Sequence, residues 1–217
     1  MGTEHQSATG VRDMLFGNVS LSSWVPQPSR ALQEPWKTFA QALDAQGSGR
    51  QLEAVALLRA VAAMPALESR HYLEAWHVLR ELGVAPSSDL AKRLYGVVVE
   101  VALPNGLDLL AAYADRTGRY LNWSGATVIW DAPDATFDSD IDVLLAIGQQ
   151  IVAQIGPWEA SHPAPPPTGH VRLNLLTPSG LHFGQGPMAD LMRDALAGPF
   201  LGAATRLMQG LTSRAKT

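Results

Sequence analysis

The chain has 217 residues, of which 47% are hydrophobic and 17% are charged, and its formal net charge at pH 7 is −4. Such a composition is typical of a folded globular protein, long enough to bury about 70% of the surface that its unfolded chain exposes. The 16 Lys and Arg residues are scattered along the chain. This argues against nucleic acid as a partner, because phosphate binding calls for clustered basic side chains.

The sequence contains no cysteine. Disulfides, thiol catalysis and thiolate metal sites are therefore excluded, and the composition fits a reducing compartment. The amino-terminal residues lack the charged region and apolar run of a signal peptide, and no apolar run reaches the roughly 18 residues of a membrane span. We expect a cytoplasmic protein without a membrane span.

Three segments are expected along the chain. Residues 1–34 are predicted to form an irregular arm, whose apolar islands around Phe16 and Trp24 either pack on the parent domain or dock onto another subunit. Residues 35–86 are predicted to form a helical extension. Residues 87–217 are predicted to form an α+β sheet domain.

The helical extension is expected to hold three helices. The first begins at Pro35, a residue that suits a first helical turn. The second spans residues 50–64 and stops before Pro65, and the third spans residues 67–82 and stops at Gly83. Because the connection between the second and third helices is short, we expect them to form an antiparallel hairpin.

Two histidines on the third of these helices suggest a metal site at first sight. His71 and His77 are six residues apart, which places them about 120° apart around the helix axis, so they cannot bind one ion from the same face. Both lie outside the apolar stripe of the helix. That stripe consists of Tyr72, Leu73, Trp76 and Leu79. We therefore predict that both histidines face solvent and that neither binds a metal.

The densest strand signal lies between residues 94 and 131. Its first hairpin is predicted to turn through a three-residue loop at 104–106, with proline at the first position and glycine at the left-handed position, so that Leu103 pairs with Leu107. A two-residue Asn-Gly turn would shift this pairing by one residue and place Asp108 on the apolar face. The segregation of polar and apolar residues favours the three-residue loop.

Two further turns complete this sheet, a three-residue loop at 116–118 and a two-residue turn at Ser124-Gly125. Because side chains alternate along a strand, the predicted pairing sorts the residues into two faces. The apolar face is predicted to carry Val97, Val99, Val101, Leu103, Leu107, Leu109, Ala111, Tyr113, Leu121, Trp123, Val128 and Trp130. The opposite face is predicted to carry Val98, Glu100, Ala102, Asp108, Leu110, Ala112, Ala114, Tyr120, Asn122, Ser124, Thr127 and Ile129.

An acidic segment at residues 131–142 follows the sheet. It resembles a calcium loop only superficially, because the glycine and the final carboxylate of an EF-hand are missing. Its aspartates are better explained as caps of a helix over residues 140–155. Gly148, within the apolar arc of this helix, predicts a close approach of its backbone to the sheet or to another helix.

A second hairpin is predicted from Gly169 through Pro178-Ser179-Gly180 to a strand from Leu181. Aligned with the first hairpin on the prolines, it matches Glu100 with Asn174 and Asp108 with His182. The likeness arises either from a faint internal duplication or from the turn residues that hairpins commonly share. In both cases Asn174 and His182 are expected to share the face of Glu100.

The last predicted elements are helices from Met188 to about Ala197 and on to roughly Gly210. The glycine-rich segment 184–187 before them lacks the lysine and the length of a phosphate-binding loop. Apolar side chains on these helices would supply a second docking surface. They are Met188, Leu191, Met192, Phe200, Leu207 and Met208.

Together these elements predict an α+β fold, with an antiparallel sheet of about five or six strands, packed helices and an amino-terminal helical hairpin. The order of helices and strands is similar, at the level of topology alone, to profilin-like sensor and roadblock-type scaffolds. Those scaffolds commonly dimerise or hold partners, which implies a binding module rather than an enzyme.

The polar sheet face is the candidate site. It is expected either to lie under the amino-terminal helical hairpin or to accept a partner protein or small ligand, with Tyr120 as an anchor. The candidate binding residues are Glu100, Asp108, Tyr120, Asn122, Ser124, Asn174 and His182. We predict no catalytic residues, no metal and no cofactor.

We therefore expect a non-enzymatic interaction or regulatory protein, a subunit of a complex that binds a protein partner or itself. The alternative is a small-ligand sensor or a weak hydrolase that uses the same face. A hydrolase would have to bring Ser124 and His182 together with an acid such as Glu100 or Asp108, and Ser124 lies outside any Gly-x-Ser-x-Gly elbow.

Overall fold

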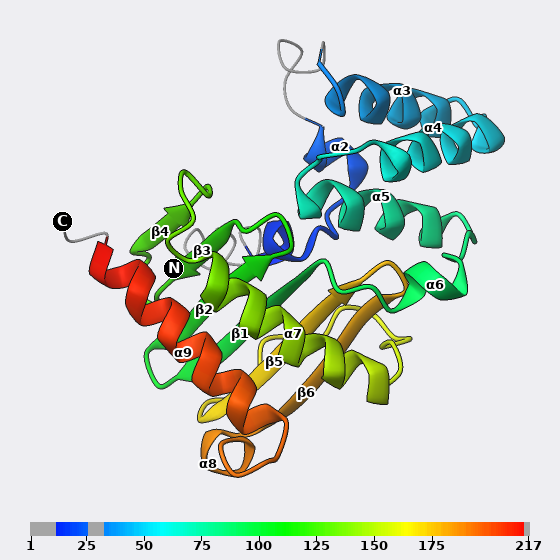
Figure 1. The fold of residues 1–217 in the computed structure, drawn as a ribbon. Helices are drawn as coiled ribbons and strands as arrows, with labels where there is room; N and C mark the ends of the chain where they lie inside the picture. The colour runs from blue at the N-terminus through cyan, green and yellow to red at the C-terminus, as the bar shows by residue number, and fades with distance from the viewer. Residues whose placement is uncertain (1–11, 26–32, 215–217) are drawn as a thin grey trace. The chain divides into compact units, whose positions relative to one another are not determined.

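The structure, a computed structural model, describes residues 12–25 and 33–214 (Figure 1). The chain divides into two compact units, residues 1–91 and residues 92–217. Much of the predicted amino-terminal arm lies outside the described residues. Within its described part, residues 12–16 are helical and a short helix α2 spans Leu21–Trp24.

The unit of residues 1–91 is helical where the structure describes it. Its longer helices are α3 (Trp36–Gly47), α4 (Gln51–Ala63) and α5 (Ser69–Glu81), followed by the short α6 (Ser88–Ala91). These helices lie where the sequence predicts them, and α4 packs against both α3 and α5. Gly49 and Gly83 adopt positive φ angles of 71° and 78° after α3 and α5, a conformation that costs glycine little.

His71 lies inside the helical unit, so the prediction that it faces solvent is wrong. The residue is 6% exposed, and its ring contacts those of Trp36 and Trp24 edge-on, with centroids 4.9 and 5.8 Å away. The aromatic side chains that enclose it come from α2 and α3. The apolar stripe of α5 considered by itself could not show this.

The unit of residues 92–217 is built on one six-stranded antiparallel sheet, which confirms the predicted α+β class. The strands are β1 (Gly96–Leu103), β2 (Gly106–Tyr113), β3 (Gly118–Leu121), β4 (Thr127–Trp130), β5 (His170–Thr177) and β6 (Gly180–Pro187). Their order across the sheet is β4-β3-β2-β1-β5-β6. The helices are α7 (Asp138–Gln154), α8 (Met188–Leu191) and α9 (Ala197–Arg214).

The first hairpin differs from the prediction by one residue. Leu103 pairs with Gly106, so the loop contains two residues, Pro104 and Asn105, and Gly106 already belongs to β2. The β5–β6 hairpin repeats this geometry, because Thr177 pairs with Gly180. Both predicted three-residue loops are therefore wrong.

The other two turns also differ from the prediction. Between β2 and β3 the left-handed residue is Arg116, with φ 66°, and the loop precedes the predicted one. Between β3 and β4 the Asn122 amide bonds to the Ala126 carbonyl at 3.0 Å, which leaves a three-residue loop with Gly125 at φ 88°. The predicted two-residue turn is therefore one residue too short.

These shifts move β2 and β3 to the other face relative to β1, because a slip of one residue reverses the side chains of a strand. The face that carries Val97 and Val99 also carries Leu110, Ala112 and Trp130. Leu109, Ala111, Tyr113 and Leu121, which were predicted for this face, lie on the opposite one.

Helices α7 and α9 lie side by side over the face that carries Val97 (Figure 1). Ile141 and Leu144 of α7 and Phe200 and Leu207 of α9 pack there and are fully buried. The close approach predicted at Gly148 is confirmed, because a Cβ atom there would lie only 2.9–3.3 Å from side chains of the sheet unit.

The acidic segment leads into a helix as predicted, but α7 starts at Asp138 and its N-cap residue is Phe137, which makes no side-chain cap hydrogen bond, so the predicted capping by aspartates is wrong. Asp138 and Asp140 occupy the first turn of α7, and Asp138 and Asp142 pair with Arg116. None of the helices in the described ranges combines the length and apolar character that crossing a bilayer requires.

Candidate functional site

The seven predicted site residues do not form one face. Glu100 and Asn174 share the face opposite α7 and α9, because Glu100 pairs with Arg172 and Val98 with Asn174. Asp108 and Tyr120 lie on the helix side of the sheet, opposite Val101 and beside Leu110. The prediction that these four side chains line one surface is wrong, and the two-residue turn at Pro104-Asn105 is the reason.

The remaining three predicted residues lie elsewhere. His182 pairs with Leu175, so it shares the helix side rather than the face of Glu100. Its ring is fully buried, and burial lowers the pKa of its imidazole. Asn122 and Ser124 lie in the connection between β3 and β4, where the side-chain oxygen Oδ1 of Asn122 accepts from the Ser124 hydroxyl at 2.7 Å. The candidates for a hydrolase are thus spread over two faces and one loop.

Asp108 and Tyr120 instead help to form a cavity of about 210 Å³ between the helix side of the sheet and helices α8 and α9. We call it the methionine pocket. It is lined by Val99, Val101, Asp108, Leu110, Tyr120, Met188, Met192, Leu201, Ala204, Thr205 and Met208. Three strands and two helices contribute to it, so residues more than 100 positions apart meet there.

The polar wall of the pocket is a hydroxyl–carboxylate pair. The Tyr120 hydroxyl donates to Asp108 Oδ2 at 2.8 Å, and the Trp123 amide donates to Asp108 Oδ1 at 2.8 Å. Burial, with the hydrogen bond and negative charge of Asp108, raises the pKa of Tyr120 to about 12. Tyr120 therefore remains protonated at neutral pH and acts as a donor.

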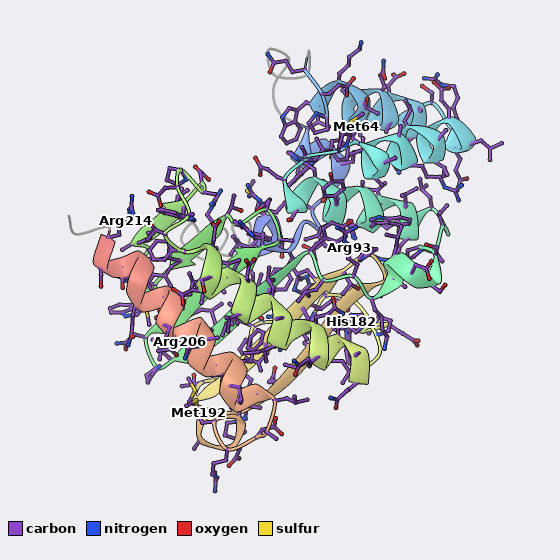
Figure 2. The ribbon with its side chains drawn as sticks, viewed as in Figure 1. Met64, Arg93, His182, Met192, Arg206 and Arg214 are labelled. Carbon is purple, nitrogen blue, oxygen red and sulfur yellow. The ribbon has the colours of Figure 1, made fainter. Side chains whose placement is uncertain are left out.

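Methionines form the outer rim of the pocket. Met188 is 38% exposed and Met192 is 52% exposed, and they are four residues apart, on one side of the helical turn at α8. Figure 2 shows Met192 beside α8. Methionine has a flexible, polarisable side chain that adapts to differently shaped apolar partners. The rim can therefore adjust to what enters.

The face opposite the helices contains a different polar group, centred on Glu100. This side chain is fully buried, and its Oε2 accepts from Asn174 Nδ2 at 3.0 Å and from Arg172 at 3.4 Å. Asn174 also donates to the Val98 carbonyl at 2.9 Å. A buried carboxylate needs such donors, because removal from water is otherwise costly.

Arg172 connects this network to the loop between α7 and β5. Its guanidinium donates to the Ala164 carbonyl at 2.7 Å and to the Gln185 side chain at 2.5 and 2.8 Å, and it lies 5.1 Å from the Phe183 ring. The Phe183 ring in turn contacts the ring of Trp158, with centroids 5.1 Å apart. The guanidinium is thus engaged in holding the loop, which indicates a structural role.

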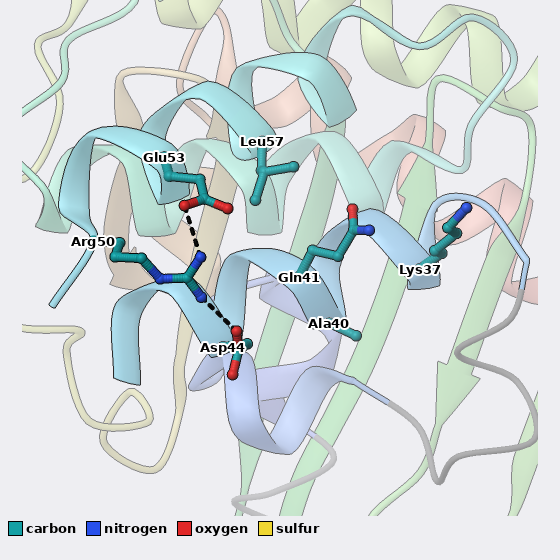
Figure 3. Close-up of a pocket in the computed structure, with 7 residues that line it drawn as sticks. All are labelled: Lys37, Ala40, Gln41, Asp44, Arg50, Glu53 and Leu57. Atoms are coloured by element: carbon teal, nitrogen blue, oxygen red, sulfur yellow. Dashed lines mark hydrogen bonds and ion pairs between the residues drawn. The ribbon is translucent and has the colours of Figure 1, made fainter. Parts of the chain in front are cut away.

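A second hollow lies in the helical unit, between α3 and α4. Figure 3 shows Lys37, Ala40, Gln41, Asp44, Arg50, Glu53 and Leu57 around it. Arg50 bridges Asp44 and Glu53, so these charges are paired with one another. Its lining holds a single large apolar side chain, Leu57. The methionine pocket is therefore the better candidate for a binding site.

No group of three or more His, Asp and Glu side chains suited to a metal ion occurs within residues 12–25 and 33–214. In the methionine pocket the titratable side chains are Asp108 and Tyr120, and they are hydrogen-bonded to each other.

Sequence reasoning identified the methionines but not the pocket. The predicted apolar docking surface consists of Met188, Leu191, Met192, Phe200, Leu207 and Met208. Phe200 and Leu207 are instead fully buried in the core, so that part of the prediction is wrong. Half of the six methionines of the chain fall in this segment. The sheet wall was missed because the predicted register placed Asp108, Leu110 and Tyr120 on the far side. The crowding of methionines is the signal in the sequence that points to this site.

The chain matches no protein-family model, no curated protein and no solved structure. The likeness in topology to profilin-like and roadblock-type scaffolds thus stays a prediction.

Proposed function

We propose that the protein is a non-enzymatic, cytoplasmic binding protein, a subunit of a complex, which holds an apolar side chain of a partner protein in the methionine pocket. The observation that carries the proposal is the pocket itself, an apolar cavity of about 210 Å³ with Met188 and Met192 exposed at its rim. Protein partners are commonly held by one anchoring side chain in such a pocket.

The size of the pocket supports a side chain as its occupant. Sites for cofactors and drug-sized ligands usually enclose about 300–1,000 Å³. The methionine pocket is smaller and is lined mostly by aliphatic groups and thioethers. One aromatic or branched aliphatic side chain would fit there, and burying it would contribute roughly 1.5–3 kcal/mol.

The polar wall supports binding rather than catalysis. Both oxygens of Asp108 accept hydrogen bonds, and the raised pKa of Tyr120 keeps its hydroxyl protonated at neutral pH. Neither group is therefore arranged to take a proton from a substrate. The pair instead gives the pocket a fixed polar edge that can orient an incoming main chain.

Trp123 adds a second contact next to the pocket. Its side chain is 51% exposed, and its amide is held by Asp108, the residue that also holds Tyr120. Exposed tryptophan and methionine are enriched at protein interfaces. The pocket and Trp123 therefore define an interface centred on Asp108.

A small apolar metabolite is the second candidate for the same pocket. The hydroxyl–carboxylate pair of Tyr120 and Asp108 favours it, because a few fixed polar groups in an apolar cavity are what orient small ligands. On this view the protein is a ligand sensor.

The test begins with a phage-displayed peptide library selected against the whole protein. Methionine methyl groups labelled with ¹³C then report binding by NMR, since Met188, Met192 and Met208 line the pocket whereas Met14 and Met64 belong to the helical unit. We expect enriched peptides that share an apolar anchor and that shift the signals of the pocket methionines.

Two substitutions on α9 form a matched pair for this test. Thr205 lines the pocket and is exposed, so Thr205→Trp should block the opening and weaken peptide binding by about ten-fold or more. Arg206 is the exposed neighbour outside the lining (Figure 2), so Arg206→Trp should leave binding unchanged.

The outcome separates the two candidates. Selection of apolar-anchor peptides whose binding depends on Thr205 supports the protein partner. A pocket that accepts small apolar compounds and ignores all peptides supports the ligand sensor. If neither kind of molecule shifts the pocket methionines, both functions are rejected.

A further inference from the structure

The rim of the methionine pocket is accessible to small reagents in water. Met192 is 52% exposed and Met188 is 38% exposed, whereas Phe200 and Leu207 of the nearby helix α9 are fully buried. Among the methionines that line the pocket, Met188 and Met192 are therefore the most accessible to a reagent. Chemical modification of these exposed methionines would change the opening of the pocket.

Sulfur chemistry in this chain is restricted to thioethers, because the sequence has six methionines and no cysteine. A protein without thiols cannot respond to oxidants by forming a disulfide or a sulfenic acid. Methionine can still be oxidised to its sulfoxide, and reductases reverse this change. Exposed methionines at a binding site thus offer a reversible chemical response.

We propose that Met188 and Met192 are oxidation sites through which a peroxide closes the methionine pocket to its apolar partner. This inference rests on the proposed function. In each step the thioether sulfur attacks one peroxide oxygen, the O–O bond breaks and an S=O bond forms. The sulfur loses two electrons, and hydrogen peroxide is reduced to water.

The lining of the pocket explains why the sulfoxides would weaken binding. A sulfoxide carries a strong dipole and needs a hydrogen-bond donor, and burying it without one is costly. Met188 and Met192 face a lining that is largely aliphatic, and the nearby Tyr120 hydroxyl already donates to Asp108. A bound apolar side chain would force the sulfoxides out of water without offering a partner.

The order of oxidation is the first measurement. Peptide mapping by mass spectrometry after graded hydrogen peroxide should show addition of one oxygen at Met192 and Met188 before Met208, which is half-buried. Met14 is 48% exposed and belongs to the helical unit, so it should oxidise at a similar rate without affecting the pocket. It therefore serves as an internal control.

Affinity is the second measurement, made with a peptide selected on the reduced protein as described above. We expect oxidation to weaken binding by about ten-fold or more, and methionine sulfoxide reductases to restore it. The double variant Met188→Leu, Met192→Leu alters the pocket rim itself, so its affinity for the peptide is first measured without peroxide. We expect peroxide to leave that affinity unchanged, because neither leucine can form a sulfoxide. The variant Met14→Leu should behave like the wild type.

The two proposals fail in different ways. A doubly oxidised protein that binds the peptide as well as before would overturn the oxidative control and leave the proposed function standing. A reduced protein whose pocket methionines respond to no peptide would overturn the proposed function and the control together. Loss of binding in the double leucine variant on oxidation would place the effect elsewhere and also reject the control.

Discussion

The two units of the molecule treat a buried carboxylate in opposite ways. Glu100 in the sheet unit and Glu74 in the helical unit are both fully buried. Glu100 accepts from Asn174 and lies 3.4 Å from Arg172, both on the neighbouring strand. Among the described residues, no side chain donates a hydrogen bond to the carboxylate of Glu74.

The difference appears in the protonation of Glu74. Burial raises the pKa of its carboxyl to about 8, with the charge of Glu81 adding to the rise and the Val19 backbone and Arg80 opposing it. The ionised form is costly when neighbours supply too little compensation. Antiparallel strands place donors directly opposite Glu100, whereas α5 offers Glu74 no such position. Burial by itself therefore does not determine what an acidic residue contributes.

The largest expected effect is at Glu100. The substitution Glu100→Ala leaves the buried charge of Arg172 without its carboxylate and Asn174 with only its bond to the Val98 carbonyl, and it should lower the free energy of unfolding by about 3–5 kcal/mol. Urea denaturation followed by circular dichroism measures the change. Glu100→Gln keeps an acceptor oxygen and should cost clearly less. If both variants lost the same free energy of unfolding, the hydrogen bonds to Glu100 would not stabilise the fold, and the contrast with Glu74 would not hold.

This contrast also shows what the sequence could reveal. The helix boundaries, the α+β class and the close approach at Gly148 followed from local signals, namely prolines, glycines and apolar periodicity. The pairing of Glu100 with Arg172 did not, because it depends on which strand neighbours β1. That neighbour, β5, is about 70 residues away in the sequence and has no local signature.

The prediction that the candidate site residues share one face of the sheet was wrong for a related reason. The three-residue loop at 104–106 is predicted because it separates polar and apolar residues cleanly between the faces, whereas the structure has the two-residue loop Pro104-Asn105. In the structure Asp108 and Tyr120 are tolerated on the core side because they bond to each other at the border of the helix layer. A rule of strict segregation fails where polar residues satisfy one another. His182 was placed on the wrong face for another reason, namely its alignment with Asp108 of the first hairpin.

At Glu74 we expect a stabilising substitution. Below pH 4.5 the carboxyl is protonated in both the folded and the unfolded state. As the pH rises from 4.5 towards 8, the unfolded state releases the proton while the folded state keeps it, so stability falls. The glutamine of Glu74→Gln does not titrate. The free energy of unfolding of this variant should therefore equal that of the wild type at about pH 4.5 and exceed it by about 2–4 kcal/mol at pH 9.

Urea denaturation at pH 5, 7 and 9 measures this trend. Glu81→Gln is the control, because Glu81 is largely exposed and its replacement removes only the smaller charge contribution to the shift. An advantage of Glu74→Gln that is the same at pH 5 and pH 9 would mean that the carboxyl of Glu74 titrates normally.

A smaller effect is expected at Tyr120. Tyr120→Phe removes the donor to Asp108 Oδ2, and it should cost about 1 kcal/mol of unfolding free energy. Because the folded pKa of about 12 lies above the ordinary value of 10, the stabilisation is complete below pH 10 and is lost as the pH rises towards 12. Absorbance at 295 nm follows the ionisation, and the variant should lack one group that titrates near pH 12.

The smallest effect is expected where a pair is exposed to water. Asp142 lies 3.1 Å from Arg116, and their side chains are 55% and 47% exposed. Asp142→Ala should change the free energy of unfolding by no more than about 0.5 kcal/mol, because water and salt screen such pairs. Measured in the same urea series as Glu100→Ala, it separates the effect of charge pairing from that of burial. A loss above about 1 kcal/mol would show that pairing alone stabilises this unit, since Asp142 has bulk water on one side and Glu100 has none.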